Sequence, residues 1–333
     1  MRPLQRQQPV AAGRSQRGAA ILMAMLTVVL VATLAASMMW QQWRGVELET
    51  VQRTRVQSAW ILTGALDWAR LILREDAREG GADHLAEPWA VPLASARLST
   101  FLAAERGQAL VGDDTDPDTE AFLAGNIEDL QARLNVANLI DSGKLNEPSL
   151  ATWAKLFKHL DLPESELDLM TQRLLLAATA LTPGKPDPKA PLWPRGVADL
   201  AWLGLSEDTL RTLSPFVTLL PVHTPVNLNT APVEVLMASV EGMTLAQARQ
   251  MVQSRAVTPI STLMDALLVV SSPDVKFDAA QHSVASRFFS VTGQLRMGQS
   301  TLQERSVLQR DGLDVKILSR QREVMATAGP RLQ

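Results

Sequence analysis

A long run of apolar positions near the N-terminus predicts a membrane-spanning helix. Between Arg17 and Arg44 the chain has 26 consecutive residues without a charge, and residues 19–40 are mostly Ala, Leu, Met and Val. A helix of about 20 residues crosses a hydrocarbon core of roughly 30 Å. Trp40 and Trp43 follow at the far end, where indole rings favour the headgroup region. The pattern therefore indicates a single membrane span.

The charge pattern sets the expected orientation of this helix. The first 18 residues hold four arginines and no acid, whereas the rest of the chain holds 28 basic and 35 acidic residues. Because arginines beside a span stay in the cytoplasm, we expect the N-terminus inside and residues 44–333 outside. Two alternatives compete. One is a secretory signal peptide cleaved near Ala36, for which the apolar run is long, and the other is a buried soluble helix, which is rarely apolar on every face.

A second helical pattern follows the apolar run and predicts a helix that packs on a sheet. Its apolar positions recur at spacings of three and four residues, at Ala59, Leu62, Leu66, Ala69 and Leu73. Such spacing places them on one stripe of a helix. We expect the helix to continue to about residue 76 and to end before Gly80-Gly81.

Alternating apolar and polar positions predict strands near the C-terminus and one earlier strand. The apolar members of the clearest run are Phe289, Val291, Leu295 and Met297. A period of two with one apolar face is typical of a half-buried strand. Asp311-Gly312 predicts a hairpin between residues 306–310 and 313–318. A shorter alternating run covers residues 96–101.

The middle of the chain reads mainly as short helices. Helical spacing covers residues 149–159, 164–180 and 230–254, and a loop rich in Pro follows the second of these. Residues 226–255 resemble a helix-hairpin-helix unit, with Thr230 as the expected helix cap and Asn side chains holding the turn beside it. A weaker echo of this unit begins at residue 134, which suggests an internal duplication.

The residues that support catalysis do not form a recognisable pattern. The chain has no Cys, and its four His residues are widely scattered. The sequence contains no HExxH metalloprotease motif, no GxSxG hydrolase motif, no P-loop and no GxGxxG dinucleotide-binding motif. We therefore expect a protein that is not an enzyme and that requires no cofactor.

One acidic segment is a candidate calcium site. Asp114, Asp116, Asp118 and Glu120 alternate, and carboxylate oxygens are the ligands that Ca²⁺ prefers. The spacing departs from an EF-hand, because Thr119 occupies the position of the turn Gly. The alternative is a solvated acidic loop.

The start of the apolar run resembles a processing signal. Arg17-Gly18-Ala19, after a short basic leader, resembles the class III signal of type IV pilins and type II secretion pseudopilins. This resemblance implies that a prepilin peptidase cuts between Gly18 and Ala19 and that Ala19 is N-methylated. Most pilins carry Glu at the fifth mature position, which is Met23 here. The K-type minor pseudopilins characteristically lack that Glu.

Several short motifs extend this resemblance to the K-type family, general secretion pathway protein K. They are residues 87–90 (EPWA), 125–129 (GNIED) with Asn135 and Asn138, 199–200 (DL), and 226–231 (VNLNTA). The family implies an α+β fold, in which a long N-terminal helix, transmembrane in its first half, lies on a small antiparallel sheet. A large all-α domain with helix-hairpin-helix-like units is inserted. The implied boundaries are a leader (1–18), a transmembrane helix (19–43), its periplasmic continuation (44–76), a pilin-like domain (77–135 and 285–333) and the insert (136–284).

The resemblance also implies a function. A K-type minor pseudopilin stands at the tip of the periplasmic pseudopilus and helps to initiate its assembly for protein export across the outer membrane. Its implied partners are the I, J and H types of minor pseudopilin, the prepilin peptidase, the secretin and secreted substrates. It would be a single-pass inner-membrane protein with a periplasmic C-terminal domain, and the family is associated with calcium sites.

An alternative function is that of an exported helix-hairpin-helix DNA-binding protein of a competence system. Such hairpins cradle a phosphate with Gly-rich amides. The hairpin here reads Glu241-Gly242-Met243, with one Gly and an adjacent acid. The carboxylate would repel phosphate, so we expect no nucleic-acid partner.

Overall fold

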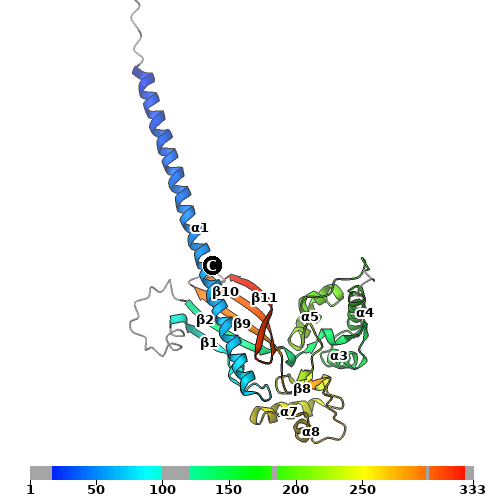
Figure 1. Ribbon diagram of the computed structural model, residues 1–333. Helices are drawn as coiled ribbons and strands as arrows, with labels where there is room; N and C mark the ends of the chain where they lie inside the picture. Colours follow the sequence, from blue (N-terminus) through cyan, green and yellow to red (C-terminus); the bar gives the residue numbers. More distant parts are fainter. Residues whose placement is uncertain (1–16, 100–120, 182–186, 298–299, 327–333) are drawn as a thin grey trace, which may run out of the picture. The chain divides into compact units, whose positions relative to one another are not determined.

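The computed structural model describes residues 17–99, 121–181, 187–297 and 300–326. The chain divides into two compact units between Ala59 and Trp60. The helices are α1 (Arg17–Glu79), α3 (Glu147–His159), α4 (Glu164–Ala180), α5 (Glu207–Leu213), α6 (Val233–Ser239), α7 (Leu245–Val257) and α8 (Leu263–Val270) (Figure 1). The short 3-10 helices are η1 (Pro88–Ala90), η3 (Leu130–Ala132), η4 (Val136–Leu139), η5 (Val197–Leu203) and η6 (Ser214–Phe216).

Five strands form the main sheet, and three pairs of two-residue strands lie elsewhere. The main strands are β1 (Leu93–Arg97), β2 (Ala121–Asp129), β9 (Phe288–Met297), β10 (Ser300–Asp311) and β11 (Asp314–Ala326). The short pairs are β3 (Leu134–Asn135) with β6 (Val217–Thr218), β4 (Ile140–Asp141) with β5 (Lys144–Leu145), and β7 (Val226–Asn227) with β8 (His282–Ser283).

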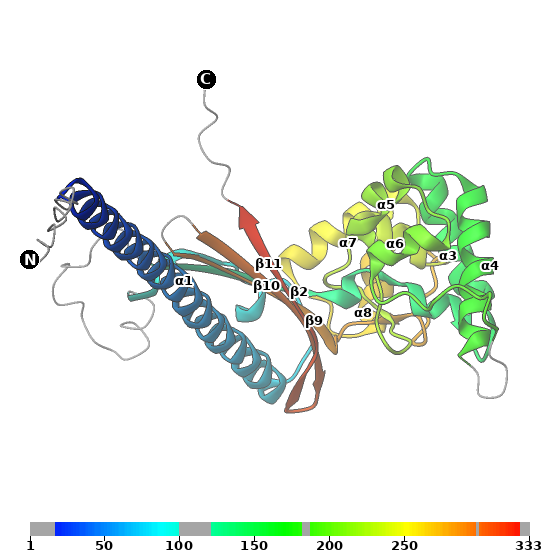
Figure 2. The same ribbon diagram turned by 90° about the horizontal axis from the view of Figure 1, so that it is seen from above.

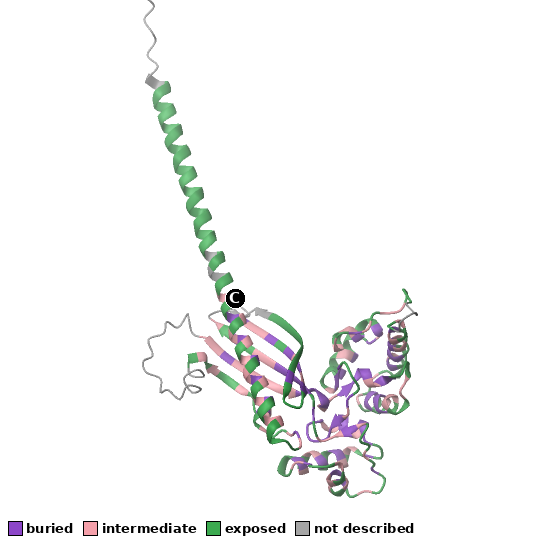
Figure 3. Cartoon of the chain, viewed as in Figure 1, coloured by how far each residue is buried: buried purple, intermediate pink, exposed green. Residues whose placement is uncertain are grey.

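The first unit contains the apolar part of α1. The segment Ala19–Val46 has a mean hydropathy of 2.5, and none of it is buried (Figure 3). It is the one described helix that is long and apolar enough to cross a membrane. The helix predicted from the apolar run is therefore present, and its apolar side chains face outward on all sides.

In the second unit, α1 packs on the sheet through the predicted stripe. Leu62, Leu66, Ala69 and Leu73 are all buried. Leu66 and Leu73 contact Phe289 and other residues of the sheet, which confirms that the stripe faces it. The stripe is buried because three- and four-residue spacing keeps these side chains on the face that the sheet covers.

The sheet is antiparallel throughout, with the order β1-β2-β9-β10-β11. Strands β2 and β9 are far apart in the sequence but neighbours in the sheet, and Figure 2 shows the helices α3–α8 grouped beyond one end of these strands. Gly125 pairs with Gly293 across them. A Cβ atom on Gly293 would lie 3.2 Å from Leu62 Cδ2, so the missing side chain lets α1 approach closely.

Two strand predictions need correction. The early strand, predicted over residues 96–101, covers Leu93–Arg97 and pairs with β2, and residues 98–99 are helical. Residues 100–101 lie outside the described residues. The run at Phe289 was predicted to be half-buried, but β9 is buried on both faces at its start. The cause is Phe288, which packs with Leu130 and Leu220 from the helical part of the chain.

The predicted C-terminal hairpin is present, with a shifted turn. Asp311 pairs with Asp314, so the turn residues are Gly312 and Leu313 rather than Asp311 and Gly312. Gly312 has φ +58°, a value that favours glycine. Strand β11 contains a bulge at Leu318, because Val307 pairs with Ser319 while the next residue of β10 pairs with Ile317.

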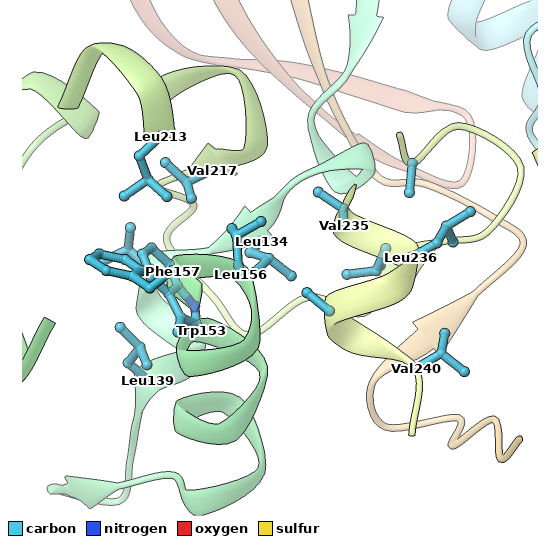
Figure 4. Close-up of a cluster of buried hydrophobic side chains, with 14 of the residues drawn as sticks. Leu134, Leu139, Trp153, Leu156, Phe157, Leu213, Val217, Val235, Leu236 and Val240 are labelled. Atoms are coloured by element: carbon cyan, nitrogen blue, oxygen red, sulfur yellow. The ribbon is translucent and has the colours of Figure 1, made fainter. Parts of the chain in front are cut away.

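The helices between β2 and β9 share one large apolar core. Trp153, Leu156 and Phe157 of α3 are buried in it together with Val235 and Leu236 of α6 (Figure 4). Four of the helices begin at a side chain that accepts a hydrogen bond from the first turn, at Asn146, Ser206, Thr244 and Thr262. Such caps are typical of short helices that must begin at defined residues.

We predict that Leu66→Ala destabilises the protein much more than Leu71→Ala. Leu66 is 2% exposed against the sheet, whereas Leu71 lies on the outer face of the same helix and is 51% exposed. The first change should lower the free energy of unfolding by about 2–5 kcal/mol, and the second by less than about 0.5 kcal/mol. Chemical denaturation of the full chain in detergent measures both. Equal effects would contradict the packing of α1 on the sheet.

Candidate functional site: an apolar helix and a buried polar junction

The predicted processing residues lie in the first turns of α1. Gly18, Ala19 and Met23 follow Arg17, the first residue of the helix, and the Ala19 and Met23 side chains are exposed. No carboxylate occurs in the sequence from Gly18 to Val46. From Ala19 to Trp40 the helix therefore offers a largely apolar surface that carries no acid.

The few hydroxyl groups in this apolar segment are satisfied within the helix. Thr27, Thr33 and Ser37 donate hydrogen bonds of 2.8–2.9 Å to the carbonyl oxygens three residues earlier. A hydroxyl group in lipid is tolerated when its hydrogen bond is made internally. The segment can therefore lie in a bilayer or against other apolar helices without leaving these groups unpaired.

The acidic residues predicted to bind calcium lie outside the described residues. These are Asp114, Asp116, Asp118 and Glu120. The structure instead brings together a different acidic group, formed by Asp76, Asp83 and Glu87, whose ligand atoms lie within 4.8 Å of one another. The sequence analysis did not single out this group, because its members have no metal-binding spacing.

Each of the three carboxylates already binds a protein donor. Arg310 forms ion pairs with Asp76, at 2.5 Å, and with Asp83. Glu87 accepts hydrogen bonds from Trp89 Nε1 at 2.6 Å and from a backbone amide. Burial and the nearby Glu87 raise the pKa of Asp76 to about 6. Arg310 thus supplies the positive charge that a cation would otherwise supply here.

A buried polar junction joins the sheet to the helical part of the chain. Its centre is Asp129, the last residue of β2, whose side chain is buried. Its Oδ2 accepts hydrogen bonds from Ser286 Oγ at 2.5 Å, Thr230 Oγ1 at 2.6 Å and Asn227 Nδ2 at 3.0 Å. Oδ1 accepts one from the Gln131 amide at 2.7 Å. Burial raises the pKa of Asp129, although these donors oppose the rise.

This junction corrects the role predicted for Thr230. Helix α6 begins after Pro232, and Pro232 makes no side-chain cap bond. The Thr230 hydroxyl donates to Asp129 instead of accepting from the helix. A hydrogen bond to a carboxylate is stronger than one from a neutral backbone amide. The Thr230 hydroxyl therefore binds Asp129 and not the first turn of α6.

The predicted role of the Asn side chains is confirmed. Asn227 Oδ1 accepts from the Asn229 amide at 2.9 Å and so holds the turn. Its Nδ2 reaches the Asp83 carbonyl oxygen and the Ser286 hydroxyl as well as Asp129. Asn229 binds both the amide and the carbonyl of Ile260, at 2.9 and 2.8 Å. The motif at residues 226–231 therefore binds four separate segments of the chain, at Asp83, Asp129, Ile260 and Ser286.

The weaker echo of this motif shows the same local geometry. Asn135 Oδ1 accepts from the Ala137 amide at 3.1 Å, two residues later, as Asn227 does from Asn229. Asn138 binds the amide and the carbonyl of Thr224. Asn135 and Asn227 each lie in a two-residue strand that pairs in parallel with another two-residue strand. The sequence echo thus corresponds to a repeated way of holding a turn.

The hairpin that suggested a DNA-binding alternative is covered by the chain itself. Gly242 has φ +74°, and a Cβ atom there would lie 2.0 Å from the Asp274 carbonyl oxygen. Glu241 forms a bridge with Lys276 on the same segment. The Gly is therefore needed for packing against residues 274–276.

Sequence reasoning missed three members of the buried clusters. Ser286 and Asp83 lie in irregular segments, which carry no periodic signal. Arg310 was placed in a strand, but its burial was not expected. Its position one residue before the hairpin pair, on a strand with buried neighbours, is the signal that could have shown it.

Comparisons with known proteins agree with the resemblance seen in the sequence. Residues 226–285, which contain the Asn227 motif, match the family described as type II secretion system (T2SS), protein K. The type II secretion system protein K of Pseudomonas aeruginosa is 28% identical over 91% of this chain and 91% of its own length. That of Klebsiella pneumoniae is 27% identical over 92% of this chain and 96% of its own.

A solved structure shows the same fold. It is the complex of GspK, GspI and GspJ from the type 2 secretion system of enterotoxigenic Escherichia coli. The matching chain superposes with a TM-score of 0.61 at 19% identity, over 82% of this chain and 98% of its own. The predicted resemblance to the K-type pseudopilins and the predicted pilin-like α+β fold are therefore confirmed.

We predict that Thr230→Val destabilises the junction. The change keeps the side-chain shape but removes a donor from the buried Asp129 carboxylate, so the free energy of unfolding should fall by about 1–3 kcal/mol. Thr212→Val is the matched control, because the Thr212 hydroxyl is exposed and bonds only within its helix. Denaturation of the full chain in detergent compares the two. An equal loss in both variants would show that the Asp129 bond contributes nothing specific.

Proposed function

We propose that this minor pseudopilin of type II secretion forms the tip of the periplasmic pseudopilus and helps to initiate its assembly. The observation that carries the proposal is the apolar segment Ala19–Val46, which is continuous with a pilin-type helix and contains no carboxylate. In the proposed cycle the basic leader stays in the cytoplasm, the segment lies in the inner membrane, and the rest of the chain is periplasmic. The role requires no catalysis.

The absence of an acid at Met23 is suited to a terminal subunit. A carboxylate in the bilayer is costly unless it meets a partner charge. In other pilins the Glu at this position is thought to meet the N-terminus of the subunit above. A subunit with none above it lacks that partner, so an apolar residue there avoids an unpaired charge.

The helical insert suits the same position. It leaves the sheet after Asp129 and returns before Phe288, and it has its own large core. A domain of this size beside the sheet would prevent another subunit from stacking above, so growth would proceed from below. The proposed partners below are sister subunits of the I, J and H types, whose helices would pack against the apolar segment. Contacts with the secretin and with secreted substrates would follow at the tip.

We predict that a prepilin peptidase produces a mature chain that begins at Ala19. Mass spectrometry of the protein extracted from membranes, made together with its own peptidase, should show this end with a methylated amine. Gly18→Val should block the cleavage. Gly45→Val, in the same helix with open space around it, should mature normally.

A chain that begins near Ala36 would contradict the proposal, because it would indicate ordinary signal-peptide cleavage. Equal maturation of the Gly18 and Gly45 variants would contradict it as well.

We also predict that the chain marks one end of an assembled pseudopilus. With the I- and J-type sister subunits it should co-purify from detergent as a complex. In filaments grown with the major pseudopilin, antibody labelling of the chain should appear at a single end. Label along the filament, or a filament that continues past the label, would overturn the tip role.

A further inference from the structure

A groove lies between the sheet and the helical insert, on the face of the sheet that turns away from α1. Neighbouring residues of a strand point to opposite faces. Glu304 and Ser306 of β10 line a cavity beside α1, whereas Arg305 and Val307 line the groove. The groove has a volume of about 890 Å³. It is therefore separate from the helix surface on which the proposed tip role rests.

Apolar side chains form much of the groove's walls. Val307 and Leu318 contribute from the sheet, and Leu219 and the half-buried Trp193 contribute from the insert. A groove with apolar walls and an indole ring offers the kind of anchoring surface that partner side chains fill in protein interfaces.

The charge of the groove is positive, although the chain outside the leader is acidic. Arg133, Arg195 and Arg305 line it, and the one carboxylate among its described lining residues is Asp199. Asp199 is engaged by the Arg195 backbone amide at 2.8 Å, and Arg133 by Glu128 at 2.9 Å. Within the described part of the chain, the Arg195 and Arg305 side chains form no ion pair.

Strand β11 provides a backbone edge beside the groove. It is the last strand in the sheet order, so its outer edge has no partner strand among the described residues. Arg70 Nε donates to the Val315 carbonyl at 3.0 Å, near the hairpin end only. Leu318, Ser319 and Gln321, further along the strand, line the groove. An edge of this kind presents unpaired N–H and C=O groups to an incoming strand.

The side chains of β11 select against an uncharged incoming strand. Lys316 is exposed on β11 and pairs with Asp314 at 3.1 Å, and Arg320 and Arg322 pair with the buried Glu304, which lies on the α1 side of the sheet. Basic residues on an edge strand discourage pairing with apolar strands. The attraction for an acidic strand comes from Arg195 and Arg305, which line the groove and form no ion pair in the described part of the chain.

We propose that an extended acidic segment of a partner protein adds to β11 as a sixth strand. Main-chain hydrogen bonds along β11 would supply affinity, since strand addition is a recurring mode of peptide recognition. Acidic side chains of the segment would pair with Arg195 and Arg305. Its apolar side chains would lie on Trp193 and Val307, so acidic and apolar residues would share the positions that face the groove, which are every second residue of the segment.

The test uses the full chain in detergent and a fluorescent peptide of about ten residues, the Val-Glu peptide, in which every second residue is Ser and the residues between them are Val and Glu in turn, so that both types face the groove. Fluorescence anisotropy at about pH 7.5, where the Glu side chains are ionised, should show binding that weakens between about 50 mM and 300 mM salt. The Val-Lys peptide, in which Lys replaces each Glu of the Val-Glu peptide, should not bind. A Val-Glu peptide with alternate amides N-methylated should also fail to bind, because it cannot complete the strand.

Charge-reversal variants test the location. Arg195→Glu with Arg305→Glu should weaken binding of the Val-Glu peptide at least about tenfold. Lys155→Glu with Arg249→Glu changes the net charge equally at exposed positions outside the groove and should leave binding unchanged. Circular dichroism confirms that all variants keep the fold.

Several results would overturn the proposal. They are absent binding of the Val-Glu peptide, equal binding of the Val-Lys peptide, and equal binding of the N-methylated peptide. Equal loss in both double variants would place the site elsewhere. Displacement of the peptide by duplex DNA but not by unlabelled Val-Glu peptide would show that the groove recognises phosphate. Self-association that excludes the peptide would show that a second copy occupies the edge. None of these outcomes depends on the tip role, which the labelling of filaments tests separately.

Discussion

The hydrogen bonds around the Asp129 carboxylate hold together the two parts of the second unit. Burying a carboxylate is costly unless donors replace its hydration. Here donors come from the end of β2, from the motif at residues 226–231 and from Ser286, just before β9. Asp129 therefore lies where the chain leaves the sheet, and Ser286 lies where it returns. The two ends of the insert are fixed to one buried charge, so the insert cannot move away from the sheet without exposing or unpairing it.

The N-terminal segment obeys the opposite constraint. From Ala19 to Trp40 it has no charged side chain, and its hydroxyls bond within the helix. Such a surface is equally suited to lipid and to apolar side chains. The same helix then changes character, because the stripe at Leu62 and Leu66 is covered by the sheet. One continuous helix thus combines an anchor without specific contacts and a core element with well-defined ones.

The sequence predicted what depends on periodicity and on strong local signals. The apolar run, the stripe on α1, the alternation at Phe289 and the Asn motifs each identified a real element or contact. The prediction failed where contacts between distant segments determine which partner a side chain binds or whether it is buried. Thr230 has the composition of a helix cap, but a buried carboxylate from another segment takes its hydroxyl. Phe288 is a polar-face position by alternation, but the insert covers it. Arg310 is charged and yet buried, because Asp76 near the end of α1 and Asp83 in the irregular segment after it both pair with it.

The adjacency of β2 and β9 has a consequence for the order of events during folding. These strands must pair across the whole insert, and closing so long a loop before its interior is compact is entropically unfavourable. The insert has its own core and capped short helices, so it can become compact first and bring the two strand ends together. Until β9 arrives, the stripe on α1 lacks Phe289, Val291 and Leu295, which cover much of it. A newly made chain therefore exposes part of that stripe until its C-terminal strands have formed, and this interval is when it is most vulnerable to aggregation and to proteases.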